Sequence, residues 1–215
     1  MADEAGAMPV SGRQDLSGRV AIVTGAARGI GRAVALALAR DGADIVAVDL
    51  LPSRDTVIGV SQQGRRAIDL TVDITHRGQI DAMVERALQE FGRVDILVNN
   101  AGVAHRSGLE ETTEAMWRRD VDVIMTGTFL VTQAVYPVMR RQRHGKIVNV
   151  SSVSAKNGGA VSRGEDPTDG PGGRTGPAYA AAKGGVLAFT RWVAKDGGRH
   201  GIWCNAVCPA RPGRR

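Results

Sequence analysis

Short apolar runs alternate with amphipathic stretches along most of the chain. Six runs are almost wholly apolar, which is typical of strands buried on both faces of a sheet. These predicted strands cover residues 19–25, 43–50, 67–72, 93–102, 145–152 and 201–209. The predicted helices, where apolar residues recur at helical spacing, cover residues 30–42, 54–63, 79–91, 113–141 (interrupted by Gly127) and 178–196. Because strands that alternate with helices imply right-handed crossovers, we expect an α/β fold with a doubly wound parallel sheet in three layers, α/β/α.

The length of 215 residues indicates one domain. We expect a flexible leader over residues 1–15 and a single domain over residues 16–215. Residues 156–177 hold seven glycines and three prolines with few apolar residues, which predicts a long loop inserted into the domain. Two interpretations of this loop stay open: a surface insertion that folding tolerates, or a lid over a site at the end of the strands.

The composition excludes several classes of protein. Hydrophobic residues make up 43% of the chain, too many for a disordered protein. No apolar run reaches the roughly 18–20 residues of a membrane span, and the N-terminus lacks the apolar segment of a secretory signal. The net charge of +6 comes almost entirely from arginines without interleaved aromatics, so it does not indicate nucleic-acid binding. Cys204 and Cys208 lie four residues apart on one predicted strand, where they could not reach each other to pair, and we expect reduced thiols in a cytoplasmic protein.

A glycine-rich turn joins the first predicted strand to the first predicted helix. In this turn, TGAARGIG over residues 24–31, the glycines allow close approach of a pyrophosphate, and the helix start offers unpaired N–H groups to that anion. Asp49 ends the second strand 18 residues after Gly31, at the spacing of a carboxylate that binds ribose hydroxyls. Asp49 would repel a 2′-phosphate and Arg28 would attract one, and on balance we expect NAD to be favoured over NADP.

Four further motifs follow the later strands in order. They are Asp73, Asn99-Asn100-Ala101-Gly102, the pair Ser151-Ser152, and Tyr179-Ala-Ala-Ala-Lys183. Together with the TGxxxGIG turn, this series resembles the short-chain dehydrogenase/reductase family over residues 19–209, most of the chain. The resemblance implies a Rossmann-type fold and an oxidoreductase that uses NAD or NADP.

The resemblance also assigns cofactor contacts. It implies that the glycine turn holds the pyrophosphate, that Asp73 holds the adenine amino group, and that Asn99 and Ala101 line the ribose and stabilise the central sheet. The cofactor-binding residues that it implies are Thr24, Gly25, Arg28, Gly29, Ile30, Gly31, Asp49, Asp73, Ile74, Asn99, Ala101, Gly102, Tyr179, Lys183 and Pro209. Asp73 also fits a helix N-cap, and residues 99–102 also fit a plain turn.

Tyr179 and Lys183 lie four residues apart, so they neighbour each other on one helical face. A phenol ordinarily ionises at about pH 10, and a nearby ammonium favours the phenolate. The resemblance implies that Tyr179 serves as acid toward a carbonyl or base toward an alcohol, that Lys183 holds the nicotinamide ribose, and that Ser152 hydrogen-bonds the substrate oxygen. The implied catalytic set is Ser152, Tyr179 and Lys183, without a metal.

Two features depart from the family pattern. Ile124 stands in the long helix where relatives usually carry an asparagine that binds a water of the proton relay. The chain ends six residues after Pro209, whereas relatives continue with a helix, a substrate-covering loop and a seventh strand. We therefore expect a C-terminally shortened member with six strands and an exposed edge at the sixth. The loop at residues 156–177 accounts for a longer than usual spacing between Ser152 and Tyr179.

The sequence thus predicts an NAD(P)-dependent oxidoreductase that moves a hydride between nicotinamide and a secondary alcohol or ketone. The alternative is a catalytically weak or inactive dinucleotide-binding relative, a sensor or a truncated fragment. Ile124 and the short C-terminus favour the alternative, and the intact catalytic set disfavours it. We expect a small-molecule substrate, no nucleic-acid or membrane partner, and a homodimer or homotetramer formed through the long helices. Because loops carry specificity in such folds, the motifs do not name the substrate.

Overall fold

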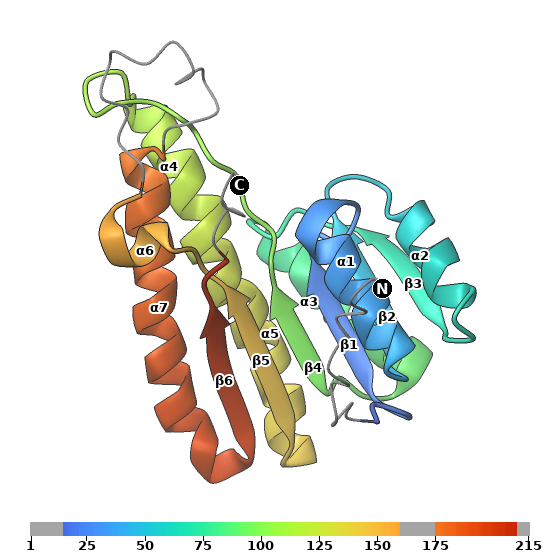
Figure 1. The fold of residues 1–215 in the computed structure, drawn as a ribbon. Helices are drawn as coiled ribbons and strands as arrows, with labels where there is room; N and C mark the ends of the chain where they lie inside the picture. Colours follow the sequence, from blue (N-terminus) through green and yellow to red (C-terminus); the bar gives the residue numbers. More distant parts are fainter. Residues whose placement is uncertain (1–14, 160–174, 210–215) are drawn as a thin grey trace, which may run out of the picture.

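Six parallel strands form one sheet in the computed structural model, which describes residues 15–159 and 175–209 (Figure 1). The order across the sheet is β3-β2-β1-β4-β5-β6, so the direction of winding reverses between β1 and β4. The strands are β1 (Val20–Thr24), β2 (Asp44–Asp49), β3 (Ala67–Thr71), β4 (Ile96–Asn99), β5 (Gly145–Val150) and β6 (Ile202–Val207). The predicted doubly wound parallel sheet is confirmed, and in such sheets ligands bind beyond the carboxyl ends at the reversal.

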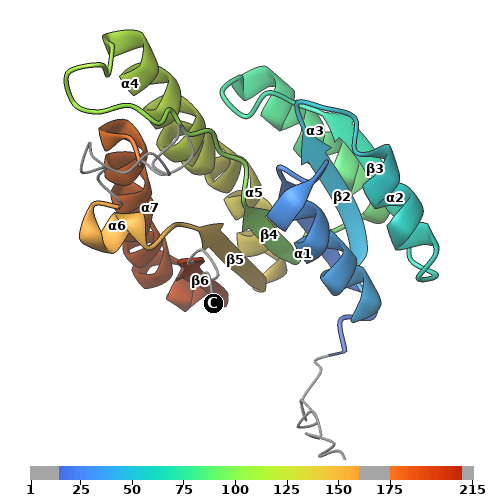
Figure 2. The ribbon, with the colours of Figure 1, turned by 45° about the horizontal axis from the view of Figure 1, so that its top comes forward.

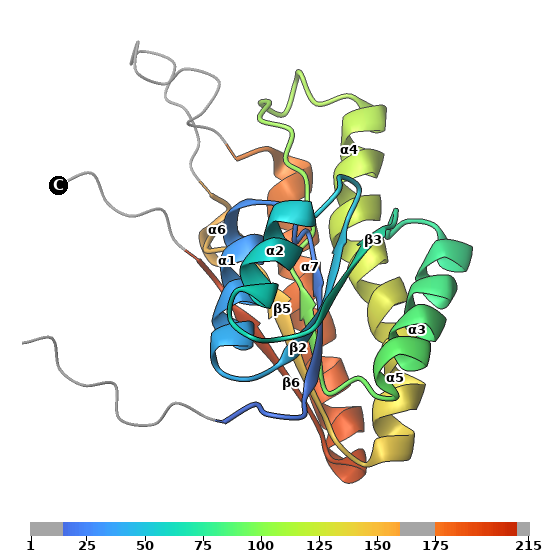
Figure 3. The same ribbon diagram turned by 90° about the vertical axis from the view of Figure 1, so that its right-hand side faces the viewer.

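Helices cover both faces of the sheet (Figures 2 and 3). They are α1 (Gly29–Arg40), α2 (Arg54–Ser61), α3 (Arg77–Phe91), α4 (Glu114–Val121), α5 (Gly127–Gln142), α6 (Ser154–Asn157) and α7 (Pro177–Gly197), with a 3₁₀ turn at Gly198–His200. Buried residues of α3, α5 and α7 pack on one face, and those of α1 and α2 pack on the other. Along β6, Ile202 and Cys204 are buried while Trp203 is 56% exposed, so one face of this strand is open among the described residues.

The long helix expected over residues 113–141 is interrupted by a π-helical stretch. Asp122–Thr126 forms this stretch between α4 and α5, so the interruption lies before Gly127 and not at it. Gly127 is needed for another reason: a Cβ there would lie 2.7 Å from Cδ1 of Ile74. The glycine lets the start of α5 approach the segment after β3, which the helical pattern alone does not indicate.

Parts of three sequence predictions lie outside the described residues. They concern the leader apart from Asp15, residues 160–174 of the inserted loop, and residues 210–215. The described ends of the inserted loop include α6, a one-turn helix that the sequence analysis did not predict.

One helix within the described ranges has the length and hydropathy of a membrane span. This is the composite helix Glu114–Gln142, with a mean hydropathy of 1.3 in its most apolar window. Val131 and Val135 of this helix are fully buried in the core formed with the sheet. It therefore serves as a core helix in this fold.

A short seam joins the two halves of the sheet. The first half holds β3, β2 and β1, and the second holds β4, β5 and β6. Across the seam, Ala21–Val23 of β1 pair with Ile96–Val98 of β4 in parallel register. Three residue pairs carry this junction, compared with five between β1 and β2 and six between β5 and β6.

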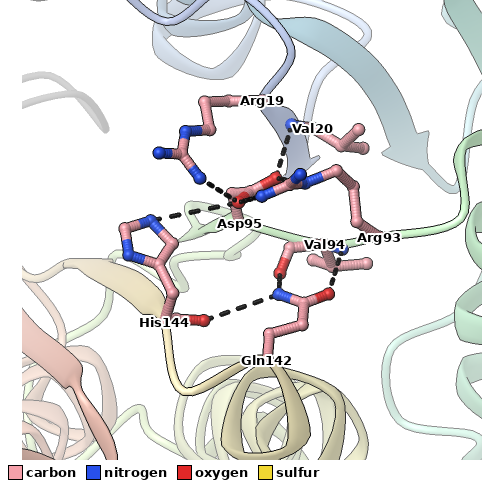
Figure 4. A network of polar contacts seen from close by, with 7 residues as sticks. All are labelled: Arg19, Val20, Arg93, Val94, Asp95, Gln142 and His144. Atoms are coloured by element: carbon pink, nitrogen blue, oxygen red, sulfur yellow. Dashed lines mark hydrogen bonds and ion pairs between the residues drawn. The ribbon is translucent and has the colours of Figure 1, made fainter.

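A buried carboxylate fastens the amino ends of the central strands (Figure 4). Asp95, directly before β4, is fully buried. Its oxygens accept hydrogen bonds from the Val20 backbone N at 3.0 Å, from Arg19 Nη1 at 3.0 Å, and from Nε and Nη2 of Arg93 at 2.7 and 2.6 Å. His144, which precedes β5, places Nε2 3.9 Å from Oδ1. Asp95 thus ties the beginnings of β1, β4 and β5 together, a role that the sequence analysis did not assign.

Gln142 adds a second tie at the same end of the sheet. Its Nε2 donates to the carbonyl of Val94 at 2.8 Å, and its Oε1 accepts from the backbone N of Val94 at 3.1 Å. The end of α5 is thereby joined to the segment that leads into β4 (Figure 4).

We predict that Asp95→Asn lowers the free energy of unfolding at pH 7 by about 1–3 kcal/mol, because the charged hydrogen bonds to both arginines are weakened. Burial raises the pKa of Asp95, but hydrogen bonds from Arg93, Val20 and Arg19 outweigh it and hold the pKa below its usual value. A carboxyl with a depressed folded-state pKa stabilises the fold above its unfolded pKa and loses this contribution as the pH falls through the folded value. Urea unfolding should therefore show a wild-type advantage that shrinks below about pH 4; an advantage independent of pH would contradict the assignment.

Candidate functional site

A cavity of about 250 Å³ opens at the carboxyl ends of β1 to β4. Seven of the predicted cofactor residues line it, namely Gly25, Arg28, Asp49, Asp73, Ile74, Ala101 and Gly102. Apolar side chains, among them Val48, Val72 and Val123, complete the wall. The cavity therefore lies at the reversal of the sheet and combines apolar walls with two carboxylates and two guanidinium groups.

The turn after β1 needs glycine for two reasons: a left-handed backbone conformation and close packing. Gly25 and Gly29 have φ values of 69° and 58°, in the left-handed region that favours glycine. Gly31, on α1, has an ordinary conformation, but a Cβ there would overlap the carbonyl oxygen of Gly25. The first turn of α1 can therefore pack directly on the loop.

Hydrogen bonds join this turn to the turn after β4. Oγ1 of Thr24 accepts from the backbone N of Asn100 at 3.0 Å and of Ala101 at 3.1 Å. In return, Nδ2 of Asn100 donates to the carbonyls of Thr24 at 3.0 Å and Gly25 at 3.2 Å. Thr24 is thus a buried organiser of the site that does not line the cavity.

The two asparagines of the NNAG motif have different roles. Asn100 lines the cavity. Asn99 is 4% exposed and does not line it; its Nδ2 donates to Thr132 Oγ1 at 3.0 Å and to Asn149 Oδ1 at 2.8 Å. The expected contribution of Asn99 to the central sheet agrees with these contacts, and it is Asn100 that lies at the cavity. Consecutive residues of a strand point to opposite faces, and the motif alone does not tell which of the two faces the cavity.

The carboxylates of Asp49 and Asp73 are held by local hydrogen bonds. Asp49 accepts from the backbone N of Ala27 at 3.0 Å and of Leu51 at 3.1 Å, so it also braces the glycine turn. Asp73 accepts from the backbone N of Thr75 at 2.9 Å and from its hydroxyl at 2.7 Å. These bonds form a local turn before α3, whose N-cap is His76, so the structure does not place Asp73 at the helix cap. Burial raises the pKa of Asp73, but the bonds from Thr75 and nearby positive charges hold it below its usual value.

Arg119 of α4 also lines the cavity, although the sequence analysis did not select it. It lies four residues before Val123, another lining residue, so the helical repeat carried a signal for it. The remaining predicted cofactor residues lie elsewhere: Gly29 and Ile30 are exposed at the start of α1, and Pro209 is exposed at the end of the described chain.

Tyr179 and Lys183 of α7 lie beside the end of β5, which Ser151 and Ser152 follow directly. Nζ of Lys183 donates to the carbonyl of Val150 at 2.5 Å and lies 5.8 Å from the ring centre of Tyr179. Ser151, beside Ser152, donates from Oγ to the carbonyl of Lys183 at 2.9 Å. Nζ of Lys183 is also 3.8 Å from the position that a Cβ would take at Gly102. Lys183 therefore connects this group of residues with the cavity, because Gly102 lines it.

Ile124 fills the position where a polar residue was expected from the family pattern. It is fully buried and packs in one cluster with Ala182, Val186 and Tyr179. Its side chain supplies no hydrogen-bonding group to the neighbourhood of Lys183. Both cysteines are free, as expected, and burial raises the pKa of Cys204 to about 12.

Comparisons with known proteins agree with this geometry. The sequence model of the short chain dehydrogenase family matches residues 19–164 and 168–211. The chain belongs to this family. It is 35% identical to 2-dehydro-3-deoxy-D-gluconate 5-dehydrogenase of Dickeya dadantii, over 91% of this chain and 72% of that protein. It is 36% identical to 3-oxoacyl-acyl-carrier-protein reductase of Synechocystis, over 90% and 74% of the two chains.

A solved structure shows the same fold. Carveol dehydrogenase from Mycobacterium avium in complex with NAD superposes with a TM-score of 0.78 at 32% identity, over 91% of this chain and 72% of that one. This short-chain dehydrogenase is therefore an NAD(P)-dependent oxidoreductase acting on an alcohol or ketone. The alternative of a binding protein without turnover is not favoured, because the relatives are named as dehydrogenases and reductases.

We predict that Gly31→Ala abolishes tight NADH binding and lowers the free energy of unfolding by about 1–3 kcal/mol, because the new Cβ must displace the backbone at Gly25. Gly78→Ala is the matched control: on α3, a Cβ at this position meets nothing within 4 Å, and alanine should stabilise the helix by about 1 kcal/mol. Fluorescence titration with NADH and thermal unfolding measure both effects. Unchanged NADH affinity in Gly31→Ala would contradict the close packing of α1 on the turn.

We predict that Lys183 makes stability rise with pH in the alkaline range. Burial lowers the pKa of Lys183 from 10.5 to about 8. Between these values the unfolded chain binds more protons than the folded one, so raising the pH favours the fold. Relative to Lys183→Met, the wild-type protein should gain about 1–3 kcal/mol from pH 8 to 10.5 in urea unfolding.

Lys195→Met controls for the loss of a lysine on the same helix, since Lys195 is exposed. Its stability should follow the wild-type pH dependence. If the free energy of unfolding of Lys183→Met changed with pH in parallel with that of the wild-type protein, Lys183 would not be desolvated.

Proposed function

We propose that this oxidoreductase moves a hydride between NAD(H) and a secondary alcohol or ketone, with Tyr179 moving the proton. The observation that supports this proposal is the position of Lys183, which lies beside Tyr179 and within reach of Gly102 at the cavity. Lys183 thereby joins the cavity that would bind the dinucleotide to the tyrosine that would transfer the proton.

The residues present fit a dinucleotide. The start of α1 has no side-chain cap, and the Cβ direction at Gly29 is open, so a phosphate can approach the free N–H groups there. The carboxylate of Asp49 faces the same cavity and suits ribose hydroxyls. When bound, the nicotinamide supplies or accepts the hydride. We propose that NAD is preferred because a 2′-phosphate beside Asp49 would bring two negative charges together.

The catalytic roles follow from the hydrogen bonds of each side chain. Oγ of Ser152 accepts from the backbone N of Ser154 at 3.1 Å, which leaves the hydroxyl hydrogen for the substrate oxygen. The phenol of Tyr179 gives its proton to this oxygen in reduction and takes it back in oxidation. Lys183 uses one of its three N–H donors on Val150, so two can serve ribose hydroxyls while the charge stabilises the phenolate.

The proton that Tyr179 exchanges does not pass through Ile124. An aliphatic side chain neither donates nor accepts hydrogen bonds, and Ile124 is fully buried against Tyr179 and Ala182. Proton exchange with solvent is therefore routed along the Lys183 and Ser152 side of the tyrosine.

The outer surface of the paired helices favours self-association. Trp117, Met125 and Phe129 on the composite helix and Trp192 on α7 are large apolar side chains that are 42–65% exposed. α4 and α7 contact each other, and large exposed apolar side chains on neighbouring helices favour association between chains. We propose a homodimer or homotetramer formed through these helices, in the cytoplasm, where free thiols persist.

Tyr179→Phe tests the proton transfer. Removing the hydroxyl should lower kcat about 10²–10⁴-fold, because no other group gives a proton to the substrate oxygen, while NADH affinity should change little. Tyr136→Phe is the matched control: it is the other tyrosine of the chain, and its hydroxyl donates to Asp196 instead. Initial rates with NADH and a panel of ketones provide the measurement. Equal kcat in Tyr179→Phe and wild-type protein would rule out the proposed role.

Asp49→Asn tests the cofactor preference. Wild-type protein should bind NADH more tightly than NADPH, and the substitution should narrow this ratio about tenfold, because a charge repulsion worth about 1–2 kcal/mol is removed. Asp55→Asn removes an exposed carboxylate of α2 and should leave the ratio unchanged. Fluorescence titrations with both dinucleotides measure the ratio; a wild-type preference for NADPH would show that Arg28 outweighs Asp49.

A further inference from the structure

A histidine–aspartate pair links the loop after β4 to α4. Asp120 on α4 is fully buried, and both of its oxygens are engaged by His105. The ring Nδ1 of His105 lies 2.7 Å from Oδ1, and the backbone N donates to Oδ2 at 3.1 Å. The side chain of His105 is 38% exposed, so the far side of its ring is accessible.

The pair fixes the tautomer of the ring. A carboxylate oxygen accepts hydrogen bonds, so the neutral form of the ring carries its proton on Nδ1 and leaves Nε2 as an acceptor. A carboxylate that orients one ring nitrogen is the arrangement by which enzymes present the other nitrogen to a reacting group. Holding the loop alone does not require this charge, because a neutral amide would accept the same backbone N–H without the desolvation cost of a buried carboxylate.

The His105–Asp120 pair lies near the start of α7, where Tyr179 is located. A Cβ at Gly176 would overlap the carbonyl oxygen of His105, and Gly176 directly precedes α7, three residues before Tyr179. Asp120 lies one helical turn before Ile124, which packs in the same cluster as Tyr179. Figure 1 shows the loop after β4 rising toward the start of α7 before the chain enters α4. The His105–Asp120 pair therefore lies between α4 and the segment that leads into the start of α7.

We propose that His105 is a substrate-recognition residue whose Nε2 accepts a hydrogen bond from a substrate hydroxyl near the reacting carbonyl. Asp120 is the positioning residue that fixes its tautomer. This inference rests on the proposed function, since it takes Tyr179 as the proton donor. It assigns the substrates to the hydroxy ketones and the corresponding diols, in preference to plain ketones. A neutral acceptor gives no such advantage to a keto acid, whose carboxylate offers no hydrogen.

Three ketones of similar size test this inference: butan-2-one, 3-hydroxybutan-2-one and 2-oxobutanoate. In initial-rate measurements with NADH, wild-type kcat/KM for the hydroxy ketone should exceed that for butan-2-one about 10–100-fold. In His105→Phe this difference should disappear, mainly through a higher KM for the hydroxy ketone. His105→Gln should keep part of the difference, because its amide oxygen is also an acceptor.

Two further variants distinguish a loss of substrate recognition from a loss of folding. Asp120→Asn should reduce the preference for the hydroxy ketone without changing NADH affinity, because an amide no longer fixes the proton on Nδ1. His200→Phe makes the same exchange beyond the other end of α7, where the ring packs against Tyr136, and should keep the full preference. NADH titration and thermal unfolding confirm that each variant is folded.

Each of three results would overturn the inference: equal kcat/KM for the two neutral ketones in wild-type protein, a preference for 2-oxobutanoate, or an undiminished hydroxyl preference in folded His105→Phe and His105→Gln. Turnover of butan-2-one without a hydroxyl preference contradicts this inference alone. Absence of NADH-dependent turnover with every probe contradicts the proposed function as well.

Discussion

The site depends on the hydrogen bonds between Thr24 and the turn after β4. Because the sheet winds in opposite directions from β1 and β4, the loops that leave these neighbouring strands diverge and leave a crevice between them. Without a tie, the two loops would be free to vary in separation. The Thr24 hydroxyl and the Asn100 amide fix that separation with four hydrogen bonds of 3.0–3.2 Å. Glycines at positions 25 and 31 then let α1 pack onto the loop, so that the start of the helix faces the crevice.

The two ends of the central strands carry different tasks. At the amino ends, the carboxylate of Asp95 bonds to Arg19, Val20 and Arg93, and its backbone carbonyl accepts from the N–H of Lys146, so the beginnings of three strands are held together. At the carboxyl ends, polar groups such as Asp49 and Lys183 face a cavity or lie beside it. Lys183 is a buried cation with a lowered pKa, an arrangement that costs stability and is typical of a functional site. Stabilising and reactive groups are thus separated by the length of a strand.

The sequence predicted the layers of the fold because strand and helix patterns depend on local periodicity. It predicted seven of the fifteen residues that line the cavity, because these lie at the ends of strands or in the turns that follow them. It did not distinguish Asn99 from Asn100, since the face that each residue occupies depends on where the strand ends. The π-helical stretch at Asp122–Thr126 left no signal in the apolar pattern. The roles of Asp95 and of the His105–Asp120 pair were not found because Arg19 and Val20 lie 75–76 residues from Asp95, and His105 lies 15 residues from Asp120, so these groups come together only through the fold.

The three-residue seam between β1 and β4 makes the centre of the sheet sensitive to two different conditions. It is the shortest strand pairing in the sheet, and hydrogen bonds flank it at both ends: Asp95 with Val20 at the amino end and Thr24 with Asn100 at the carboxyl end. Protonation of Asp95 weakens the bonds at the amino end. A dinucleotide in the cavity would contact the loops after both β1 and β4, because Gly25 and Asn100 line it. Acid and a bound cofactor therefore act on opposite ends of the same strand pairing, acid weakening it and the cofactor stabilising it.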